Sequence, residues 1–285
     1  GFILSAQSYI DLHIHSTYSD GLLSPAEITA YAHQVGLATI AITDHDDLSA
    51  YHEARAAGET LGLEVIPGIE LSAIYNGCEA HILGYLYDVT NAPLISFSEH
   101  MRANRIERAR EIIQRLRHLG MPISFDMVQM RAGHGALGRP HIADIMVEEG
   151  YVFSFNEAFQ KFLGENKPGY VPKMKLMAEE AIALIHDSGG LAFLAHPGTG
   201  ATIEAIEALI EMGLDGLETI HPRHAPEMVD YYRGLARRSG LLETGGSDCH
   251  GARRGEMMIG TQSVPREYLE EMRRHLALTN FSESA

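Results

Sequence analysis

The stretch DLHIHSTYSDG, residues 11–21, places two histidines two positions apart in an apolar segment. Side chains alternate between the two faces of a strand, so His13 and His15 point to one side and their apolar neighbours to the other. Two adjacent imidazoles, followed by the carboxylate of Asp20, suit a divalent metal ion. The pattern alone fits an ordinary pair of half-buried histidines equally well, so the rest of the chain has to decide between the two interpretations.

Short apolar runs recur along the chain, and most of them end in a polar residue that could bind a metal. Runs of this length that contain β-branched residues are typical of buried parallel strands. We expect such strands at residues 9–15, 37–43, 63–69, 80–87, 190–195, 215–220 and 241–246.

Helical segments lie between these runs. Residues 24–27, SPAE, have the N-cap serine, the N1 proline and the N3 glutamate of a capping box, which predicts a helix of about ten residues ending near Gly36. Strands that alternate with helices indicate βαβ units. We therefore expect an α/β fold, a distorted (β/α)7 TIM-like barrel with functional groups at the carboxyl ends of its strands. The other helices expected around it are residues 53–61, 178–188, 203–212 and 227–239.

Residues 99–175 interrupt this alternation. They hold 12 lysines and arginines against 9 aspartates and glutamates, while the rest of the chain holds 10 against 29. We expect a barrel made of residues 1–98 and 176–285, and an inserted helical cap subdomain at residues 99–175. The basic surface of this insert is either a solvated helical face or a surface that meets an anionic substrate. Within the insert we expect helices at 99–119 and 158–163, the first with core contacts at Met101, Ile106, Ile113, Leu116 and Leu119.

The overall composition excludes several classes of protein. A formal net charge of −16 argues against long nucleic acid as a partner. Two cysteines, Cys78 and Cys249, provide no disulfide framework, and we expect Cys249 to be a small packing residue. No apolar run is long enough to span a membrane, and residues 1–4 lack the charged start of a signal peptide. We expect a cytoplasmic protein with no membrane partner.

Nine residues that follow or close the expected strands form a candidate metal site. Six imidazoles and three carboxylates suit zinc, manganese or iron, and they are too many for one ion. Three divalent ions that share one carboxylate would use all of them, and no organic cofactor is expected. The nine residues are His13, His15, Asp20, His45, Glu70, His81, His196, Asp248 and His250.

The segments that carry these residues resemble the polymerase and histidinol phosphatase (PHP) superfamily of metal-dependent phosphoesterases. The matching segments are DLHIHSTYSDG, ITDHD, PGIE, HILGY, AHP and GSDCH, which run in family order from residue 11 to residue 250. The chain resembles in particular the branch with a small helical insert, through GRPHIA at residues 138–143 and KPGYVP at residues 167–172. Proteins of that branch remove phosphate from nucleotides, including nucleoside 3′,5′-bisphosphates, and some trim short RNA from its 5′ end.

The resemblance implies a trinuclear site and a phosphoesterase activity. It implies substrates that are nucleoside monophosphates such as AMP, nucleoside 3′,5′-bisphosphates, or the 5′ ends of short RNA. Because a bound metal lowers the pKa of water to about 7, we expect a hydroxide that bridges two ions to attack phosphorus. The implied ligand sets are His13, His15, Glu70 and Asp248 for one ion, Glu70, His81 and His196 for a second, and Asp20, His45 and His250 for a third.

Residues expected on the substrate side are less distinctive. In the sequence HPRH, His221 or His224 would be a general acid, unless prolines make this segment a surface turn. His221 and Arg223 are also expected to contact the substrate. Arg139 is expected to bind a phosphate through two parallel hydrogen bonds from its planar guanidinium and to take part in catalysis. The alternative is that Arg139 is a solvated arginine in a loop. Lys167 and Lys173 are further candidates for substrate binding. Arg102 and Arg105 are expected to be solvated charges on a helix. The aspartates beside His45 either support its position or form a turn; they are Asp44, Asp46 and Asp47.

Three other functions are weighed against this one. An amidohydrolase-like C–N hydrolase also uses His-x-His on a barrel strand, but such sites often contain a bridging lysine, and no lysine precedes Lys161. A histidinol phosphate phosphatase is disfavoured by the nucleotide-type insert. A non-catalytic metal-binding module is disfavoured by the complete set of candidate ligands.

Overall fold

The computed structural model describes residues 9–133, 135–252 and 255–283. Residues 1–4, on which the expectation about a signal peptide rests, lie outside these ranges. Over the described residues, no helix combines the length and the apolarity that a membrane crossing requires.

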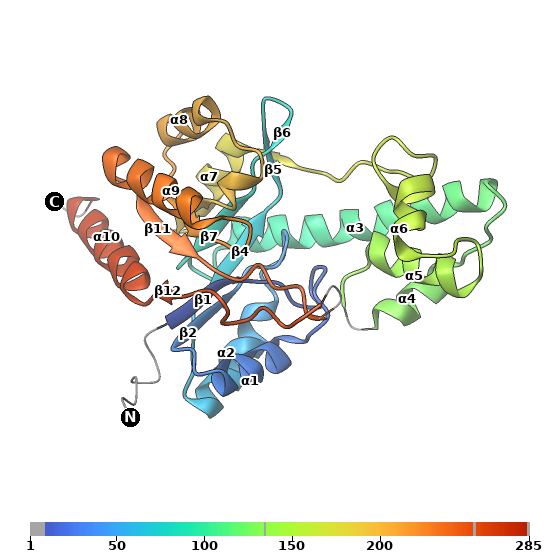
Figure 1. The fold of residues 1–285 in the computed structure, drawn as a ribbon, viewed down its shortest axis with the longest axis horizontal. Coiled ribbons are helices and arrows are strands. Elements are labelled where there is room, and N and C mark those ends of the chain that lie inside the picture. Colours follow the sequence, from blue (N-terminus) through green and yellow to red (C-terminus); the bar gives the residue numbers. More distant parts are fainter. Residues whose placement is uncertain (1–8, 134, 253–254, 284–285) are drawn as a thin grey trace.

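A four-stranded sheet in the order β12-β1-β2-β3 forms one side of the molecule. Its strands β1 (Tyr9–Ile14), β2 (Thr39–Ile42) and β3 (Glu64–Val65) are parallel, and β12 (Val264–Pro265) is antiparallel to β1 at the edge. Helices α1 (Pro25–Gln34) and α2 (Ala50–Leu61) follow β1 and β2 and lie side by side beneath this sheet (Figure 1). The capping box predicted at the start of α1 is confirmed, because Ser24 and Glu27 cap each other reciprocally.

A five-stranded sheet in the order β11-β10-β9-β7-β4 forms the other side. Its strands are β4 (Gly68–Leu71), β7 (Ile82–Tyr85), β9 (Leu191–Leu194), β10 (Gly216–Ile220) and β11 (Leu242–Gly245). The expected purely parallel arrangement is wrong for β7, which is antiparallel to both β4 and β9. The chain between β4 and β7 is a short excursion through β5 (Ala73–Tyr75) and β6 (Cys78–Glu79), whereas parallel neighbours need a longer crossover. The two-residue strand β8 (Leu176–Met177) pairs with β5.

The two sheets meet at the carboxyl ends of their strands without forming one continuous ladder. Isolated bridges join His45 to Glu70 and Ile14 to Cys249. The run expected as one strand at residues 63–69 is divided at Pro67, which has no N–H for a ladder, so that β3 belongs to one sheet and β4 to the other. The fold of the described residues is therefore a mixed α/β arrangement, and no closed barrel is found among them.

Helices α7 (Ala178–Asp187), α8 (Ile203–Glu211) and α9 (Pro226–Ser239) cover the five-stranded sheet and confirm three predicted helices. A 3-10 turn (Pro197–Thr199) follows β9. The last helix, α10 (Glu267–Glu283), is absent from the sequence-based prediction. Ile69, Ile82 and Ile185 belong to the core between this sheet and its helices.

A long helix, α3 (Ala92–His118), connects this body to a helical lobe (Figure 1). The helix begins before residue 99, where it was expected, because the side chain of Asn91 caps it. Leu94 packs into the main core, whereas Leu116 packs into a separate core of the lobe, so the expected domain boundary falls inside one helix. The lobe contains α4 (Phe125–Ala132), α5 (Arg139–Glu148), α6 (Phe155–Ala158) and a π-helical turn (Phe159–Leu163).

Most of the predicted core contacts of α3 are confirmed. Met101, Ile113 and Leu116 are buried, and Ile106 packs partly buried against the core of the lobe. Leu119 is 45% exposed, so its predicted core contact is wrong. It is the C-cap residue, and the chain turns away from the helical face at this point.

Candidate metal centre

The histidines of the first sheet lie where its strands end. His13 is the penultimate residue of strand β1 and His15 directly follows the strand, while His45 follows β2. Glu70 lies in β4, and His81 directly precedes β7. Because β7 is antiparallel to its neighbours, its beginning lies at the same edge as the ends of the parallel strands. The reversed direction of β7 thus brings His81 to the other candidate ligands.

One group of donor atoms is formed by His13, His15, Asp248 and Glu70. The two Nε2 atoms of His13 and His15 lie 3.2 Å apart. Asp248 Oδ1 lies 3.4 and 3.1 Å from these nitrogens, and Glu70 Oε2 lies 3.4 and 3.2 Å from them. Ligand atoms about 2.0–2.1 Å from a tetrahedral ion are roughly 3.3–3.4 Å from one another. The donors of His13, His15 and Asp248 all lie within 4.8 Å of one another. Their spacing therefore fits a single divalent ion, with Glu70 Oε2 beside the two histidines.

Glu70 reaches a second group of donors with its other oxygen. Glu70 Oε1 lies 2.9 Å from His81 Nδ1 and 3.2 Å from His196 Nε2. Its Oε2 also lies 3.2 Å from Nδ1 of His45. Each carboxylate oxygen of Glu70 therefore faces a different set of histidine nitrogens. This is the position that a carboxylate bridging two metal ions requires.

The third group surrounds Asp20. Asp20 Oδ1 lies 3.3 Å from His250 Nε2 and 3.7 Å from His15 Nδ1, and Asp20 Oδ2 lies 3.9 Å from His45 Nε2. Donor atoms of His15, Asp20, His45 and His250 all lie within 4.8 Å of one another. All nine predicted ligands therefore lie in one continuous cluster. His15 and His45 each lie in two of its groups, so the assignment of ligands to individual ions stays a prediction.

The hydrogen bonds around the cluster fit a metal site. Nδ1 of His13 donates to Glu218 at 2.8 Å, which leaves Nε2 of His13 with its lone pair toward the cluster. A carboxylate that holds the far nitrogen of a histidine is a common feature of metal ligands. Nδ1 of His45 is buried and forms no well-aligned hydrogen bond among the described residues, although Glu70 Oε2 lies 3.2 Å from it. An acceptor left in this condition is unfavourable unless it has a ligand.

Crowding perturbs the ionisation of these groups. Burial disfavours charge on Glu70, but the surrounding histidines outweigh it and hold the pKa of its carboxyl well below the usual range. Burial disfavours protonation of His15, yet hydrogen bonds to Asp248 and Glu70 raise its pKa to about 10. Burial lowers the pKa of His45 to about 3. The buried carboxylates thus demand positive charge, which protons on histidine supply when a metal ion does not.

His221 is turned toward Asp248 instead of standing free as a proton donor. Its Nε2 lies 3.2 Å from Asp248 Oδ2, while its Nδ1 accepts the backbone N–H of Arg223 at 3.1 Å. Since Nδ1 is an acceptor, the proton is on Nε2 and is donated to the aspartate. His221 is buried and Arg223 is exposed, in the turn that precedes α9.

His224 does not have the arrangement that the predicted general acid needs. Its Nδ1 donates to the carbonyl of Thr219 at 3.0 Å, and its Nε2 accepts the N–H of Gly198 at 3.0 Å. Burial also lowers the pKa of His224. Both ring nitrogens are occupied by backbone groups, so the side chain holds two loops together and we correct its role accordingly.

The three cations predicted for substrate binding occupy different surroundings. Arg139 lines the cleft beside the donor cluster and donates to the carbonyl of Leu163 at 3.0 Å. Lys173 also lines this cleft, with its Nζ 3.1 Å from a carboxylate oxygen of Asp46. Lys167 is exposed in a turn and is not among the residues that line the cleft.

The expectation that both Arg102 and Arg105 are solvated is wrong for Arg105. Its guanidinium donates to the carbonyls of Tyr18 and His45, at 3.0 and 2.9 Å. It therefore connects α3 to the loop of Asp20 and the loop of His45, two of the three loops that carry ligands of the third group. Arg102 is 47% exposed and pairs with Asp47 at 3.2 Å.

Asp44 and Asp46 hold the loops of the cluster in place. Asp44 accepts the backbone N–H and the hydroxyl of Ser16, at 2.7 and 2.5 Å, and the hydroxyl of Ser19 at 2.5 Å. Asp46 has a positive φ of 54° and accepts the N–H of Ser72 at 2.7 Å. The sequence left open whether these aspartates support the site or form turns. The structure shows that Asp44 and Asp46 do both.

Two functional positions were missed in the sequence. Glu218 holds His13 and also accepts the backbone N–H of His196 at 2.7 Å. An acidic residue inside the apolar run at 215–220 was the available signal. Arg108, which lines the cleft beside Arg139, had no signal beyond its membership of a basic helix.

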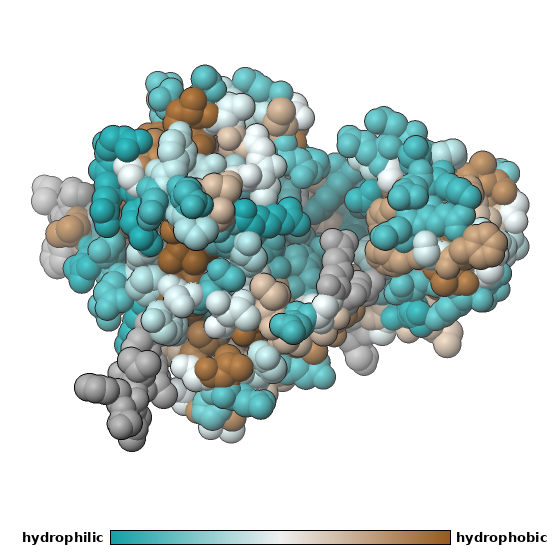
Figure 2. Space-filling view, in the orientation of Figure 1, coloured by the Kyte–Doolittle hydropathy of each residue, from teal (hydrophilic) through white to brown (hydrophobic). Residues whose placement is uncertain are grey.

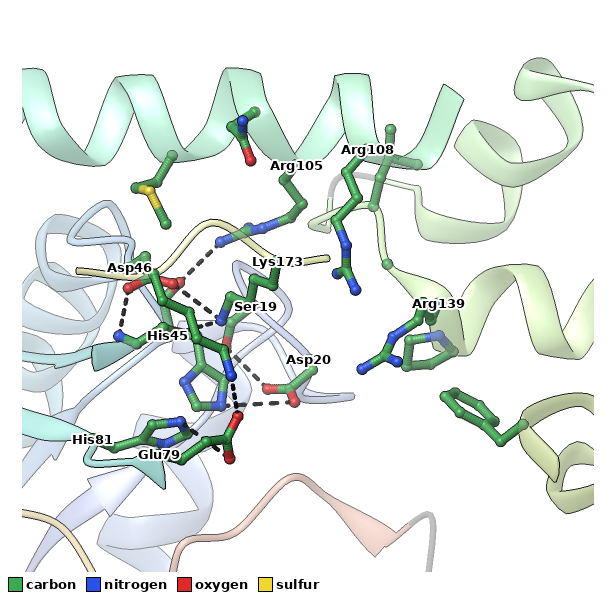
Figure 3. Close-up of a pocket in the computed structure, with 18 of the residues that line it drawn as sticks. Ser19, Asp20, His45, Asp46, Glu79, His81, Arg105, Arg108, Arg139 and Lys173 are labelled. Atoms are coloured by element: carbon green, nitrogen blue, oxygen red, sulfur yellow. Dashed lines mark hydrogen bonds and ion pairs between the residues drawn. The ribbon is translucent and has the colours of Figure 1, made fainter. Parts of the chain in front are cut away.

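The cleft beside the cluster has a volume of about 500 Å³, and both the body and the lobe line it. Asp20, His45 and His81 lie on the side of the body, and Arg108 and Arg139 reach in from the lobe (Figure 3). The surface is hollowed and hydrophilic where the lobe meets the body (Figure 2). A second recess, between the lobe and the loop around Arg223, borders the other side of the cluster. Both recesses include Asp20, Pro140 and Phe155.

Comparison with known proteins gives consistent matches over most of the chain. The PHP domain model matches residues 11–196. The 5′-3′ exoribonuclease Rnm of Escherichia coli is 36% identical over 247 residues, which cover 84% of each chain. The 3′,5′-nucleoside bisphosphate phosphatase of Chromobacterium violaceum is 33% identical over 265 residues, which cover 90% of this chain and 92% of that protein.

Two of the solved structures that match cover most of the chain. One, from Bifidobacterium adolescentis, is assigned to the metal-dependent phosphoesterases and has a TM-score of 0.82 at 32% identity, covering 92% of this chain and 94% of that one. The other is called an amidohydrolase from Chromobacterium violaceum and contains sulfate but no metal. Its TM-score is 0.80 at 30% identity, covering 94% and 96% of the two chains.

Proposed function

The chain belongs to the PHP domain family and hydrolyses phosphoric ester bonds, and from this premise we propose that its substrates are nucleotides. The proposed substrates are nucleoside monophosphates such as AMP, nucleoside 3′,5′-bisphosphates, and short RNA with a free 5′ end. The relatives named for bisphosphates and for RNA support this range. The observation that carries the proposal is the cleft itself, in which arginines of the lobe face the donor cluster across a space of about 500 Å³.

We propose that the cluster holds three divalent ions of manganese, zinc or iron. Ions bound there polarise phosphoryl oxygens and make a water molecule acidic enough to act as a nucleophile near neutral pH. The spacing of 3.1–3.4 Å among the donors of the first group supports an ion at that position. The proposed ligands are His13, His15, Asp20, His45, Glu70, His81, His196, Asp248 and His250.

The chain's own residues would prepare this site and orient the substrate. Glu218 fixes the tautomer of His13, and the bond from Nε2 of His221 fixes the carboxylate of Asp248. Hydrolysis forms a bond from water oxygen to phosphorus and breaks the ester P–O bond, after which the leaving oxygen gains a proton. Cys249 is 2% exposed and its Sγ lies 3.6 Å from the sulfur of Met257, which supports a packing role and not a nucleophilic one.

We also propose that residues 99–175 act as a cap over the metal-binding body formed by residues 1–98 and 176–285. The separate core of the lobe, with Ile112, Ile142 and Met146 among its residues, supports this division. Helix α3 crosses the proposed boundary and couples the two parts. The cap supplies Arg139 to the cleft, as expected for a basic surface that meets an anionic substrate.

We further propose a cytoplasmic protein that acts on small phosphorylated molecules and binds neither membranes nor long nucleic acid. The formal net charge of −16 supports the last point, because it repels extended phosphate backbones. The two free cysteines, Cys78 and Cys249, are consistent with a reducing compartment.

The decisive experiment measures phosphate release by the manganese-loaded protein from nucleoside monophosphates, 3′,5′-bisphosphates, histidinol phosphate and short 5′-phosphorylated RNA. For RNA the released mononucleotides are measured as well. We expect turnover of the nucleotide substrates and little of histidinol phosphate. No turnover of any phosphate ester, together with hydrolysis of an amide or cyclic amide, would overturn the proposal in favour of the C–N hydrolase. The metal-free protein is the control.

A further inference from the structure

The donor cluster is bordered by two recesses. The cleft shared by the body and the lobe lies on one side of it, and the second recess, of about 450 Å³, lies on the other. Asp20, Pro140 and Phe155 line both recesses, so the two spaces adjoin beside the cluster. Asp248 and His250 line the second recess alone, and their side chains are 18% and 35% exposed. The proposed metal ligands are therefore accessible from two directions.

The second recess contains one positively charged side chain that has no protein partner. Among the described residues, Arg223 is the only lysine or arginine that lines this recess. It is exposed in the turn between β10 and α9, and its guanidinium has neither an ion pair nor a hydrogen bond within the described part of the chain. All five N–H donors of the guanidinium are therefore available to an anionic ligand.

The turn that carries Arg223 is connected to the donor cluster. The backbone N–H of Arg223 donates to Nδ1 of His221 at 3.1 Å, and Nε2 of the same ring lies 3.2 Å from Oδ2 of Asp248. His221 is buried, so this connection is shielded from water. The free guanidinium thus has a backbone whose position is fixed relative to a proposed metal ligand.

The rest of the recess offers apolar surface. Pro140 and Phe155 of the lobe and Pro222 and Met258 of the body all line it. The ring of Phe155 lies 5.0 Å from that of Phe159, so that aromatic surface continues beyond the recess. Nucleobases stack on aromatic side chains whatever their sequence, and a nearby positive charge holds the phosphate backbone. The recess combines both of these features of a site for single-stranded nucleic acid.

Two adjoining spaces match the shape of a phosphodiester. The phosphorus of a diester carries a nucleoside on each side, whereas that of a monoester carries one. Attack by water forms a new P–O bond and breaks the bond to one nucleoside oxygen, which leaves with a proton, while the other nucleoside keeps the phosphate. The cleft and the second recess can each hold one of these two parts. A volume of about 450 Å³ is in the range of pockets that enclose a small organic ligand.

We propose that the second recess is a subsite for the RNA chain beyond the phosphodiester that is hydrolysed. The apolar surface of Phe155 and Met258 takes the next nucleoside, and Arg223 binds the phosphate that follows it. The site then favours a chain of three nucleotides over a mononucleotide, because only the chain reaches Arg223 while its reacting phosphate is at the donor cluster. This inference rests on the proposed nucleotide phosphoesterase function and assigns a choice among its substrates to one residue of the body.

The test compares substrates that differ in chain length. For the manganese-loaded protein, kcat/KM is measured with a nucleoside 3′,5′-bisphosphate and with 5′-phosphorylated di- and trinucleotide RNA. We expect the ratio of kcat/KM for the trinucleotide to that for the bisphosphate to fall about tenfold in Arg223→Ala, because one charged contact is lost. Arg223→Lys keeps the charge and should retain most of the ratio. Arg237→Ala is the matched control, because Arg237 is also exposed, lies on α9 and lines neither recess.

The same contact is measured without catalysis. The metal-free protein is titrated with a 3′-labelled RNA pentanucleotide by fluorescence anisotropy at several salt concentrations. Loss of one phosphate contact on a single strand lowers the slope of log Kd against log salt by roughly 0.7. We expect this change in Arg223→Ala and the wild-type slope in Arg237→Ala. An unchanged ratio of kcat/KM in Arg223→Ala would overturn the inference, as would equal changes of slope in the two alanine variants.

The proposed function and this inference can fail separately. If the wild type hydrolyses the bisphosphate but neither RNA, the phosphoesterase function holds and the RNA subsite is wrong. If the wild type turns over no phosphate ester at all, the proposed function fails, and both proposals fall together.

Discussion

Glu218 in β10 and His13 in β1 form a fully buried hydrogen bond of 2.8 Å that joins the two sheets beside the donor cluster. The other carboxylate oxygen of Glu218 accepts the backbone N–H of His196 at 2.7 Å. One side chain thus fixes the ring of one proposed metal ligand and the backbone of another. Such a carboxylate raises the basicity of the histidine it holds and orients its free nitrogen.

Replacement of Glu218 by glutamine is expected to weaken metal binding by roughly 10- to 100-fold. The amide is a poorer acceptor for the His13 N–H, and its NH2 end cannot accept a hydrogen bond at all. The measurement is a titration of the metal-free protein with Mn²⁺ or Zn²⁺ by calorimetry. Glu243→Gln is the control, because Glu243 lies on the neighbouring strand and accepts hydrogen bonds from Tyr268 and Thr219, away from the cluster. Equal metal affinities in wild type and Glu218→Gln would contradict the role assigned to Glu218.

Removal of metal is expected to lower thermal stability. Three carboxylates and six imidazoles lose the cations proposed to bind them, and the buried charge of Glu70 is then balanced by protons alone. Binding to the native state contributes about 2.7 kcal/mol when free metal is about 100 times its Kd, and chelation removes this contribution. The measurement is Tm by calorimetry with EDTA and again after addition of Mn²⁺. A Tm that is unchanged by EDTA in a protein shown to contain metal would exclude a metal-stabilised cluster.

His224→Gln is expected to reduce stability more than catalysis. The ring of His224 connects the carbonyl of Thr219 to the N–H of Gly198, and glutamine cannot satisfy both groups in the same positions. Loss of a buried partner costs about 1–3 kcal/mol. The measurements are urea unfolding of the metal-free protein and kcat of the folded variant, which we expect within tenfold of wild type. A much larger loss of kcat with unchanged stability would restore His224 as the predicted proton donor.

Arg105→Ala is expected to loosen the loops of the third donor group. The guanidinium of Arg105 bonds to the carbonyls of Tyr18 and His45, and these residues are close to Asp20 in sequence or in space. Arg105→Lys should restore metal binding only in part, because one ammonium group does not reproduce the geometry with which the guanidinium donates to two carbonyls. Metal content per chain, measured by mass spectrometry after dialysis, should fall in the alanine variant. If Arg105→Ala retained the metal content of the wild type, the loops would keep their positions without the hydrogen bonds from Arg105.

The parts of this fold that the sequence allowed us to predict depend on local signals. Ser24 and Glu27 sit in a capping box whose geometry is fixed within four residues, so helix α1 was located correctly. The polar residues that end apolar runs were correctly expected to converge, because parallel strands share one edge. His81 joined them for a different reason, since it precedes an antiparallel strand.

The parts that could not be predicted depend on contacts between distant segments. Glu218 and His13 are 205 residues apart, and no local pattern states that a strand glutamate will meet a strand histidine. Arg105 looked solvated because helical spacing shows which residues share a face, but not which loops lie opposite that face. The division of one apolar run into β3 and β4 likewise followed from Pro67 and from pairing partners in two sheets.

The pair of His186 and Asp215 is expected to make stability depend on pH away from the metal centre. Nε2 of His186 lies 2.7 Å from Asp215 Oδ2, and this hydrogen bond raises the pKa of His186 above its usual value of 6.5. The stabilisation is fully present below the pKa of the unfolded chain and is lost as pH rises through the higher pKa of the folded protein. It is small, because the His186 side chain is 37% exposed and water screens the pair.

The measurement is the difference in unfolding free energy between wild type and His186→Gln, taken by urea titration of the metal-free protein across neutral pH. We expect the wild type to be the more stable protein at the acidic end, with the difference shrinking as pH rises. Metal is left out because its own binding depends on pH through the histidines of the cluster and would mask the small effect. A difference that stays constant, or that grows with pH, would mean that the pair is not charged in the folded protein.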